Sequence, residues 1–292
     1  MNAEGLAPML IEALKALLIG LVEGITEWLP ISSTGHMILV DEFVKLQVSD
    51  SFLALFLVVI QIGAIMAVII LYFHKLNPFS RRKSPLQKNK TWTLWGKVIL
   101  ACIPSAVIGL PLNDWMDEHL MNPWVVAAAL IVYGVGFLLI ENRRRTPTIR
   151  RTDELSWQTA LFIGLFQALS IIPGTSRSGA TILGAILLGC ARPVAAEFSF
   201  FLAIPTMVGV SVLKLGSFFA DKLSAGQALF TGEEFAILLV GFVVAFVVSL
   251  LCIRFLMDFV KKHDFKPFGW YRIALGALVL IFFGVQALIS PT

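Results

Sequence analysis

Residues 160–190 read ALFIGLFQALSIIPGTSRSGATILGAILLGC, in which two apolar runs flank the polar stretch 173–181 and its single arginine, Arg177. Proline and glycine at positions 173 and 174 interrupt helical geometry, so the segment predicts two short helices around a loop. A second apolar region, residues 6–40, is divided by Pro, Gly, Ser and Thr in the same way. Because lipid cannot bond free N–H and C=O groups, both loops must line a cavity or be covered by protein.

The composition is typical of an integral membrane protein, since 58% of the 292 residues are hydrophobic and only 14% are charged. The apolar runs suit membrane-spanning helices of about 20 residues, whereas a barrel would show alternating segments of about 10. We predict an all-α, polytopic membrane protein with six transmembrane helices plus two re-entrant helix hairpins. Residues 1–8 carry no basic residue and no cleavage site follows, so we expect the first apolar segment to be retained. The six spans are expected at residues 52–73, 95–112, 124–140, 198–219, 235–256 and 270–289.

Basic residues are distributed unevenly between the connections. Segments 75–97, 143–154 and 254–266 carry seven, five and four Lys/Arg, which predicts that they face the cytoplasm. The connections at 41–51, 113–122 and 216–234 carry one, none and one, and we expect them outside. The net charge of +4 therefore reflects loop asymmetry, and we expect no nucleic-acid partner. The prediction is a multi-pass protein of the bacterial inner (plasma) membrane.

Two stretches of the chain are alike at a spacing of 144 residues. ALLIGLVE at 16–23 matches ALFIGLFQ at 160–167 in five positions, and Pro123 and Pro267, which each open an apolar span, keep the same spacing. The chain therefore predicts a single integral membrane domain built of repeat 1 (about 1–145) and repeat 2 (about 146–292). Each repeat has one broken segment and three spans; because three is odd, the second repeat must lie inverted. The two loops would then meet, with Arg177 facing the first loop.

The first loop contains two glutamates four residues apart, Glu23 and Glu27, which share one helical face. Like charges at this spacing repel unless a positive group lies between them, and either a divalent cation or Arg177 would serve. An ionisable group at bilayer depth costs about 3 kcal/mol, so three of them in two short segments indicate function. The structural alternative is that the glutamates lie at the membrane interface and point into solvent.

Hydroxyl side chains follow the proline in each loop. They can cap the return helices, which we expect to start near His36 and Ala180, and they can also bind an anion at the helix N-termini. The fork of the Arg177 guanidinium suits phosphate oxygens, so phosphate is the predicted anion. The predicted substrate-binding residues are Ser32, Thr34, Thr175, Ser176, Ser178 and Thr181.

The remaining polar groups indicate catalysis. Glu23 and Glu27 are predicted to hold a divalent cation, Mg²⁺ or Ca²⁺, that neutralises phosphate oxygens. Ser33 can attack with His36 as base or acid, or His36 can itself be the nucleophile, while Arg177 stabilises the transition state. The structural alternative for His36 is a hydrogen-bonded histidine of the core.

EGITEWLPISSTGH at 23–36, PGTSRSGAT at 173–181 and EFSFFLAIP at 197–205 together resemble the bacitracin-resistance (BacA) family of undecaprenyl-diphosphate phosphatases. The likeness covers nearly the whole chain. It implies hydrolysis of undecaprenyl diphosphate to undecaprenyl phosphate and inorganic phosphate, which recycles the lipid carrier of peptidoglycan synthesis. It also implies an inverted-repeat fold, an active site open to the outer face and a divalent-cation requirement. The family's functional positions fall on Glu23, Glu27, Ser33, His36 and Arg177.

Two other classes of function stay open at this stage. A transporter or flippase of an anionic polyprenyl lipid would use the same inverted repeat with broken helices. Such a carrier needs the arginine and the helix ends but no nucleophile, so the residues favour the enzyme. A scaffold role leaves the intramembrane charges unexplained. The expected partners are a polyprenyl diphosphate lipid and the membrane, and a homodimer is one alternative for the oligomeric state.

Overall fold

The computed structural model describes residues 3–143, 146–224, 226 and 229–289. Arg144 and Arg145, two of the basic residues counted in segment 143–154, lie outside the described residues. Within the described part all regular elements are helices. The β-type pairing there is limited to one isolated bridge between Ile149 and Cys190. The prediction of an all-α protein is therefore confirmed.

Six of the described helices are long and apolar enough to cross a membrane, and each overlaps one of the predicted spans. Five contain the whole predicted span, whereas α3 (Asp50–Leu71) ends two residues before the predicted end at 73. Hydroxyl and amide side chains mark several of their starts; Ser49, for example, accepts a hydrogen bond from the Phe52 N–H at the beginning of α3. The six helices are α3 (Asp50–Leu71), α5 (Pro85–Leu120), α6 (Pro123–Asn142), α9 (Arg192–Ser224), α10 (Gly232–Phe259) and α11 (Lys266–Ile289). Three short elements lie between longer helices: α4 (Phe73–Leu76) before α5, η1 (Thr152–Glu154) after α6, and η2 (Leu169–Ile171) within the second broken region.

Both broken regions are interrupted as the sequence predicts. The first consists of α1 (Ala3–Thr26) and α2 (Ser33–Phe43), and the second of α7 (Trp157–Ala168) and α8 (Arg177–Leu187). The expectation of two short arms is wrong for α1, which runs for 24 residues because no proline follows Pro8, near its start, until Pro30 in the loop. The expected starts of the return helices at His36 and Ala180 are also wrong, since both helices begin three residues earlier.

The two return helices begin in the same backbone conformation. Ser32 (φ 74°) and Ser176 (φ 70°) each adopt the left-handed region directly before α2 and α8. Each serine oxygen then accepts a hydrogen bond from the backbone N–H three residues on, at 3.3 Å from Gly35 and 3.1 Å from Gly179. Ser176 lies 144 positions after Ser32, so the local geometry repeats at the spacing found in the sequence.

Close glycine contacts hold each first arm against a membrane-spanning helix. A Cβ on Gly20 of α1 would lie 2.7 Å from the Gly241 carbonyl oxygen of α10, and one on Gly164 of α7 would overlap the Ala101 carbonyl oxygen of α5. Small residues allow this approach, which gives van der Waals contact where no hydrophobic driving force acts between helices. Gly20 and Gly164 are themselves 144 positions apart.

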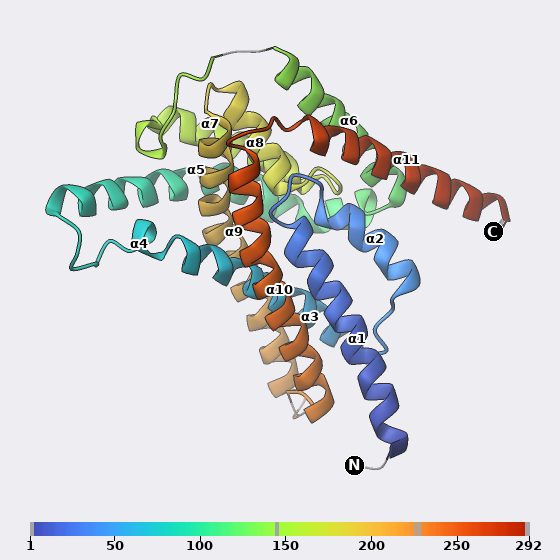
Figure 1. Ribbon diagram of the computed structural model, residues 1–292. Coiled ribbons are helices and arrows are strands. Elements are labelled where there is room, and N and C mark those ends of the chain that lie inside the picture. Colours follow the sequence, from blue (N-terminus) through green and yellow to red (C-terminus); the bar gives the residue numbers. More distant parts are fainter. Residues whose placement is uncertain (1–2, 144–145, 225, 227–228, 290–292) are drawn as a thin grey trace.

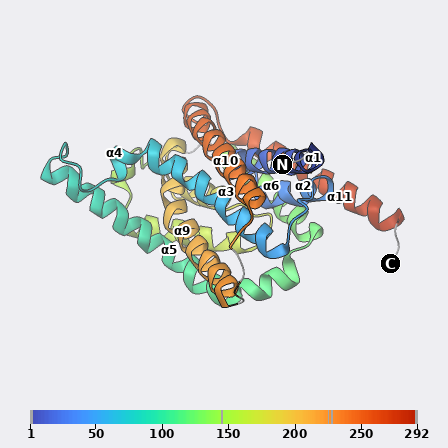
Figure 2. The ribbon, with the colours of Figure 1, turned by 90° about the horizontal axis from the view of Figure 1, so that it is seen from below.

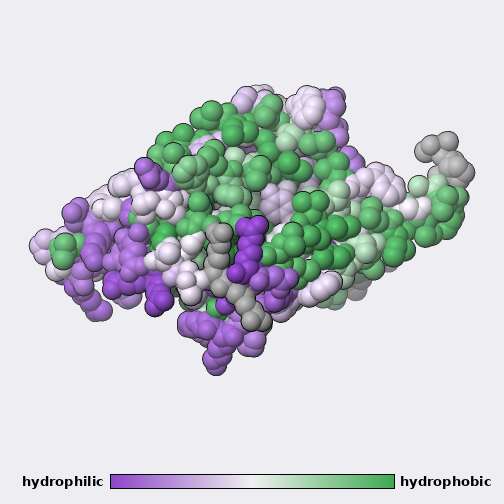
Figure 3. All heavy atoms as spheres, turned by 90° about the horizontal axis from the view of Figure 1, so that it is seen from above, coloured by the Kyte–Doolittle hydropathy of each residue, from purple (hydrophilic) through white to green (hydrophobic). Residues whose placement is uncertain are grey.

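The arrangement places the two breaks in the middle of the molecule. Figures 1 and 2 show α1, α3 and α10 packed side by side, with α2 and α8 near the centre of Figure 1. Many large hydrophobic side chains point outward, such as Leu251 (61% exposed) on α10, and Figure 3 shows a largely hydrophobic face with polar residues gathered toward α4 and the start of α5. This surface suits a lipid environment.

Candidate active site

An ion pair joins the two broken regions. The Arg177 Nη2 and Nε atoms donate to Glu27 Oε1 at 2.9 and 3.3 Å, although the two residues are 150 positions apart. Both side chains are nearly buried, with 13% and 11% of their surface exposed. Arg177 Nη1 also donates to the Ser199 carbonyl at 3.0 Å, and its guanidinium lies over the Trp28 ring at 5.9 Å. The structure therefore brings Arg177 to the first break, as the sequence predicts.

Glu23 lies one helical turn before Glu27 and is 4% exposed. Its Oε1 atom is buried and has no hydrogen-bond partner among the described residues. A buried carboxylate without a partner is costly, and a cation would remove that cost. The structure describes no group of three or more Asp, Glu, His or Cys residues suited to a metal ion. Two carboxylates fit Mg²⁺ in particular, because this ion usually takes one or two carboxylates and completes its shell with water and substrate phosphates.

Ser33 and His36 both lie in the first turn of α2 but have different partners. The Ser33 hydroxyl donates to Glu27 Oε2 at 3.4 Å. The His36 Nδ1 atom lies 2.7 Å from the Ser32 carbonyl, which can only accept, so Nδ1 carries the proton. In the neutral ring His36 Nε2 is then free to accept from the Tyr271 hydroxyl, which lies 2.7 Å away. The hydrogen-bond partner of the Ser33 hydroxyl is therefore the Glu27 carboxylate and not the His36 imidazole.

Arg272 of α11 is a buried charged residue beside the two breaks that the sequence reasoning missed. Its side chain is fully buried and donates from Nη1 to the Pro30 carbonyl at 3.1 Å. Its Nη2 donates to the carbonyls of Gly174 and Thr175, both at 2.9 Å. One guanidinium thus satisfies backbone acceptors in both breaks and fixes them to each other. A lone arginine in an otherwise apolar span is the signal that could have marked it.

The predicted substrate-binding hydroxyls differ in what they contact. Ser178 and Thr181 form hydrogen bonds inside the protein: Ser178 donates to the Leu29 carbonyl at 3.2 Å, and Thr181 lies 2.6 Å from the Ser199 hydroxyl. Thr175 is fully buried. Ser32 and Ser176 cap α2 and α8, and Thr34 is half-buried in the first turn of α2. Contact of these residues with a substrate stays a prediction.

These features define a class of protein: a multi-pass helical membrane protein with a charged, hydroxyl-containing centre where two broken helical segments meet. Such a centre can accept a phosphate group, because a guanidinium, two helix N-termini and a pair of carboxylates suited to a cation converge there.

The comparisons with known proteins give the family. The family model described as bacitracin resistance protein BacA matches residues 16–278, and the chain belongs to this family. It is 61% identical over 272 residues to a protein of Latilactobacillus sakei named undecaprenyl-diphosphatase, which covers 92% of this chain and 97% of that protein. A protein of the same name from Lactiplantibacillus plantarum is 62% identical, and the match covers 94% of this chain and 98% of that protein. Another from Limosilactobacillus fermentum is 60% identical, and the match covers 95% of this chain and 100% of that protein.

Proposed function

We propose that this protein is a membrane phosphatase that hydrolyses undecaprenyl diphosphate to undecaprenyl phosphate and inorganic phosphate. The relatives named undecaprenyl-diphosphatase are 60–62% identical over nearly their full length. The single observation that carries the proposal is the Arg177–Glu27 pair across the two breaks, beside the unpartnered carboxylate of Glu23. Hydrolysis of this diphosphate would recycle the lipid carrier of peptidoglycan synthesis.

Arg177 is the proposed phosphate-binding group. Three of its N–H groups donate to Glu27 and Ser199, which leaves two N–H groups of the guanidinium for phosphate oxygens. A permanently charged donor placed beforehand stabilises the charge that develops on the transferring phosphoryl group. Glu23 and Glu27 would hold a divalent cation, which when bound supplies further neutralisation of the diphosphate oxygens.

Ser33 is the proposed nucleophile, because its hydroxyl already donates to Glu27 Oε2. Its oxygen would attack the terminal phosphorus while its proton passes to Glu27. The phosphorus–oxygen bond of the anhydride bridge breaks, and undecaprenyl phosphate leaves. Water then hydrolyses the phosphoserine and releases inorganic phosphate. His36 is the alternative nucleophile, and its hydrogen bonds to Ser32 and Tyr271 would orient the ring in either role.

We also propose that the two broken regions are re-entrant hairpins within an inverted repeat. In each region the chain after the return helix contacts the first arm or its approach, which supports the proposal: Gln47 N–H donates to Glu12, within α1, at 2.9 Å, and Ile149, before α7, pairs with Cys190, after α8. The matching serine caps and glycine contacts at a spacing of 144 residues support the repeat. Opposite insertion would bring the two breaks together near the bilayer midplane.

The proposed location is the bacterial inner membrane, with the site open to the outer face. The basic segments gather at one end of the bundle, where Lys75 pairs with Glu197 and Lys90 pairs with Asp153. An excess of Lys and Arg marks the cytoplasmic side. The first hairpin ends at segment 41–51, which has a single Lys/Arg and faces away from that side in this topology.

The test is phosphate release by the purified protein in detergent with undecaprenyl diphosphate as substrate. We expect release that stops with a chelator and returns with excess Mg²⁺. Absence of release under all conditions would overturn the proposal.

A transporter of anionic polyprenyl lipids is the second candidate, favoured by the two broken helical segments that meet in the middle of the molecule. This function predicts that the lipid moves between the two leaflets of proteoliposome membranes without phosphate release.

A further inference from the structure

A second charged centre lies at the basic end of the bundle, formed by residues that the proposed mechanism does not use. A cavity of about 580 Å³ opens between α5, η1 and the start of α9. Five Lys/Arg but only two Asp/Glu residues line it, so the cavity carries an excess of positive charge. The charged lining residues are Lys75, Lys90, Lys97, Arg150, Arg151, Asp153 and Glu197.

The two carboxylates already have partners. Lys75 lies 2.6 Å from Glu197, which also accepts a short hydrogen bond from the Thr152 hydroxyl. Lys90 lies 2.9 Å from Asp153, and Arg151 donates to the same carboxylate through Nε and Nη2 at 3.0 Å each. The hydrogen bond from Lys90 lowers the pKa of Asp153, with help from Arg151, so this carboxylate is ionised and engaged.

Lys97 takes no part in these ion pairs and hydrogen bonds. It lies on the membrane-spanning helix α5, is only 6% exposed, and lines the cavity. Among the described residues no acceptor bonds its ammonium and no carboxylate oxygen lies within 4.0 Å of it. A buried ammonium without a partner is costly, and an anion in the cavity would remove that cost.

Arg150 provides a second cation with no partner at its side chain. Its backbone N–H donates to Glu154 at 2.9 Å, but its guanidinium makes no hydrogen bond or ion pair within the described residues. It is exposed, whereas Lys97 is buried. The cavity thus offers one buried and one accessible positive group to the same ligand.

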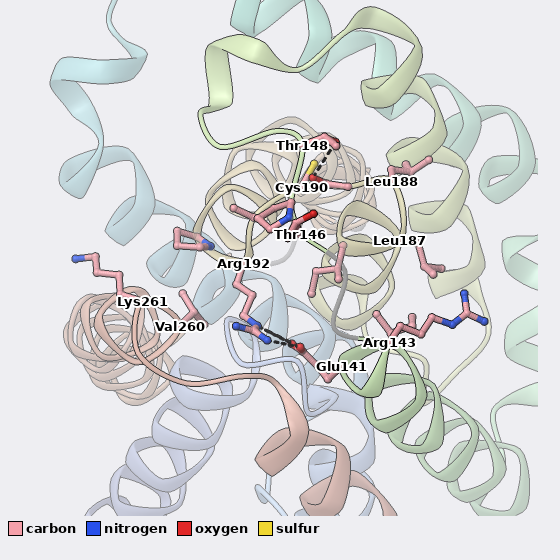
Figure 4. Close-up of a pocket in the computed structure, with 16 residues that line it drawn as sticks. Glu141, Arg143, Thr146, Thr148, Leu187, Leu188, Cys190, Arg192, Val260 and Lys261 are labelled. Carbon is pink, nitrogen blue, oxygen red and sulfur yellow. Dashed lines mark hydrogen bonds and ion pairs between the residues drawn. The ribbon is translucent and has the colours of Figure 1, made fainter.

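The neighbouring cavity of about 510 Å³ shows the opposite situation (Figure 4). Its buried charge, Glu141, faces Arg192 with Nη2 at 2.5 Å and Nε at 2.9 Å, and it also accepts the Phe265 N–H at 3.0 Å. The buried charge is matched inside the protein there, so Glu141 needs no external ion, in contrast to Lys97.

We propose that the cavity at Lys97 binds the phosphate group of an anionic ligand. An ammonium and a guanidinium are the usual partners of phosphate, as a point charge and a fork of donors. An anionic lipid headgroup and free phosphate share this chemistry. The lipid is favoured because Lys97 lies on a membrane-spanning helix and because Leu94, Val194 and Met257 add apolar lining.

The test measures thermal unfolding of the full-length protein in neutral detergent during titration with one of three additives. These are dioleoyl-phosphatidylglycerol, dioleoyl-phosphatidylcholine and inorganic phosphate. The readout is the concentration that gives half of the maximal shift of the unfolding temperature. The variants are Lys97→Met, which keeps the buried stem, and Arg150→Gln; Lys262→Met, an exposed lysine that does not line the cavity, is the matched control.

We expect phosphatidylglycerol to stabilise the wild type more than phosphatidylcholine does. Lys97→Met and Arg150→Gln should raise the half-saturating concentration by about tenfold or more, while Lys262→Met leaves it unchanged. The same Lys97 dependence for inorganic phosphate alone would assign a soluble ligand to the site. If the wild type responds to neither anion, or if Lys97→Met matches Lys262→Met, the proposal is wrong. Should Lys97→Met not fold, an unchanged response of Arg150→Gln overturns it.

Discussion

Arg272 Nη1 lies 3.1 Å from the Pro30 carbonyl oxygen, while Nη2 of the same guanidinium bonds two carbonyls of the second break. The two charged loops therefore share a rigid connection that lies outside both of them. Because the backbone acceptors at a break have no helical partners, their bonding to one buried cation fixes the distance between Glu27 and Arg177.

Replacement of Arg272 should separate the two breaks. Arg272→Met leaves carbonyls in both loops without donors, so we expect a loss of about 3 kcal/mol or more in stability together with a loss of phosphatase activity. Arg272→Lys should retain part of the stability and part of the activity, since an ammonium reaches fewer of the backbone carbonyls than the guanidinium does. Thermal unfolding in detergent measures the effect, and Arg254→Met on exposed α10 surface is the control. An unfolding temperature for Arg272→Met equal to that of Arg254→Met would contradict this role.

Removal of the Glu23 charge should separate activity from stability. In Glu23→Gln the buried, unpartnered carboxylate is replaced by a neutral group, so the unfolding temperature without divalent cation should stay the same or rise. Phosphate release should fall about 100-fold or more, and Mg²⁺ should no longer stabilise the protein. Glu118→Gln, at an exposed carboxylate, provides the comparison. Wild-type stabilisation of Glu23→Gln by Mg²⁺ would show that the cation binds elsewhere.

Much of the fold could be predicted from local sequence signals. Pro173 and Gly174 marked the second break, and the six apolar runs marked the spans, because both features act through neighbouring residues alone. The helix starts were missed by three residues, since a positive φ is rare for serine and nothing in the sequence marks it at Ser32 and Ser176, directly before each helix. The length of α1 was missed because no proline follows Pro8 until the loop, so the helix continues through Gly20 and Gly24.

The site was predictable only where the repeat related its two parts. The spacing of 144 residues predicted that Arg177 faces the first loop, and its ion pair with Glu27 agrees with that prediction. Nothing in the run around Arg272 indicates which carbonyls it bonds, because its acceptors come from loops about 100 and 240 positions away. The hydrogen bond between His36 and Tyr271 depends on the same long-range packing.

The close contact between α7 and α5 predicts a strong size effect at Gly164. A Cβ there would overlap the Ala101 carbonyl oxygen, whereas a Cβ on Gly109 of α5 would meet no atom within 4 Å outside its own stretch of the helix. We expect Gly164→Ala to destabilise the protein by about 1–3 kcal/mol and Gly109→Ala to leave stability unchanged or slightly raised. Unfolding temperatures of the two variants, measured side by side, check this. Equal values would mean that the helices can separate without cost.

The Glu27–Arg177 pair tests the central claim most directly, through a double-mutant cycle on phosphate release from undecaprenyl diphosphate. Glu27→Gln and Arg177→Met should each lower the rate about 100-fold or more, and the double variant should be little worse than the weaker single variant, because the two groups act as one unit. Glu118→Gln should keep the wild-type rate. Near wild-type release by either single variant, or losses in the double variant that simply multiply, would contradict a single site shared by the two breaks.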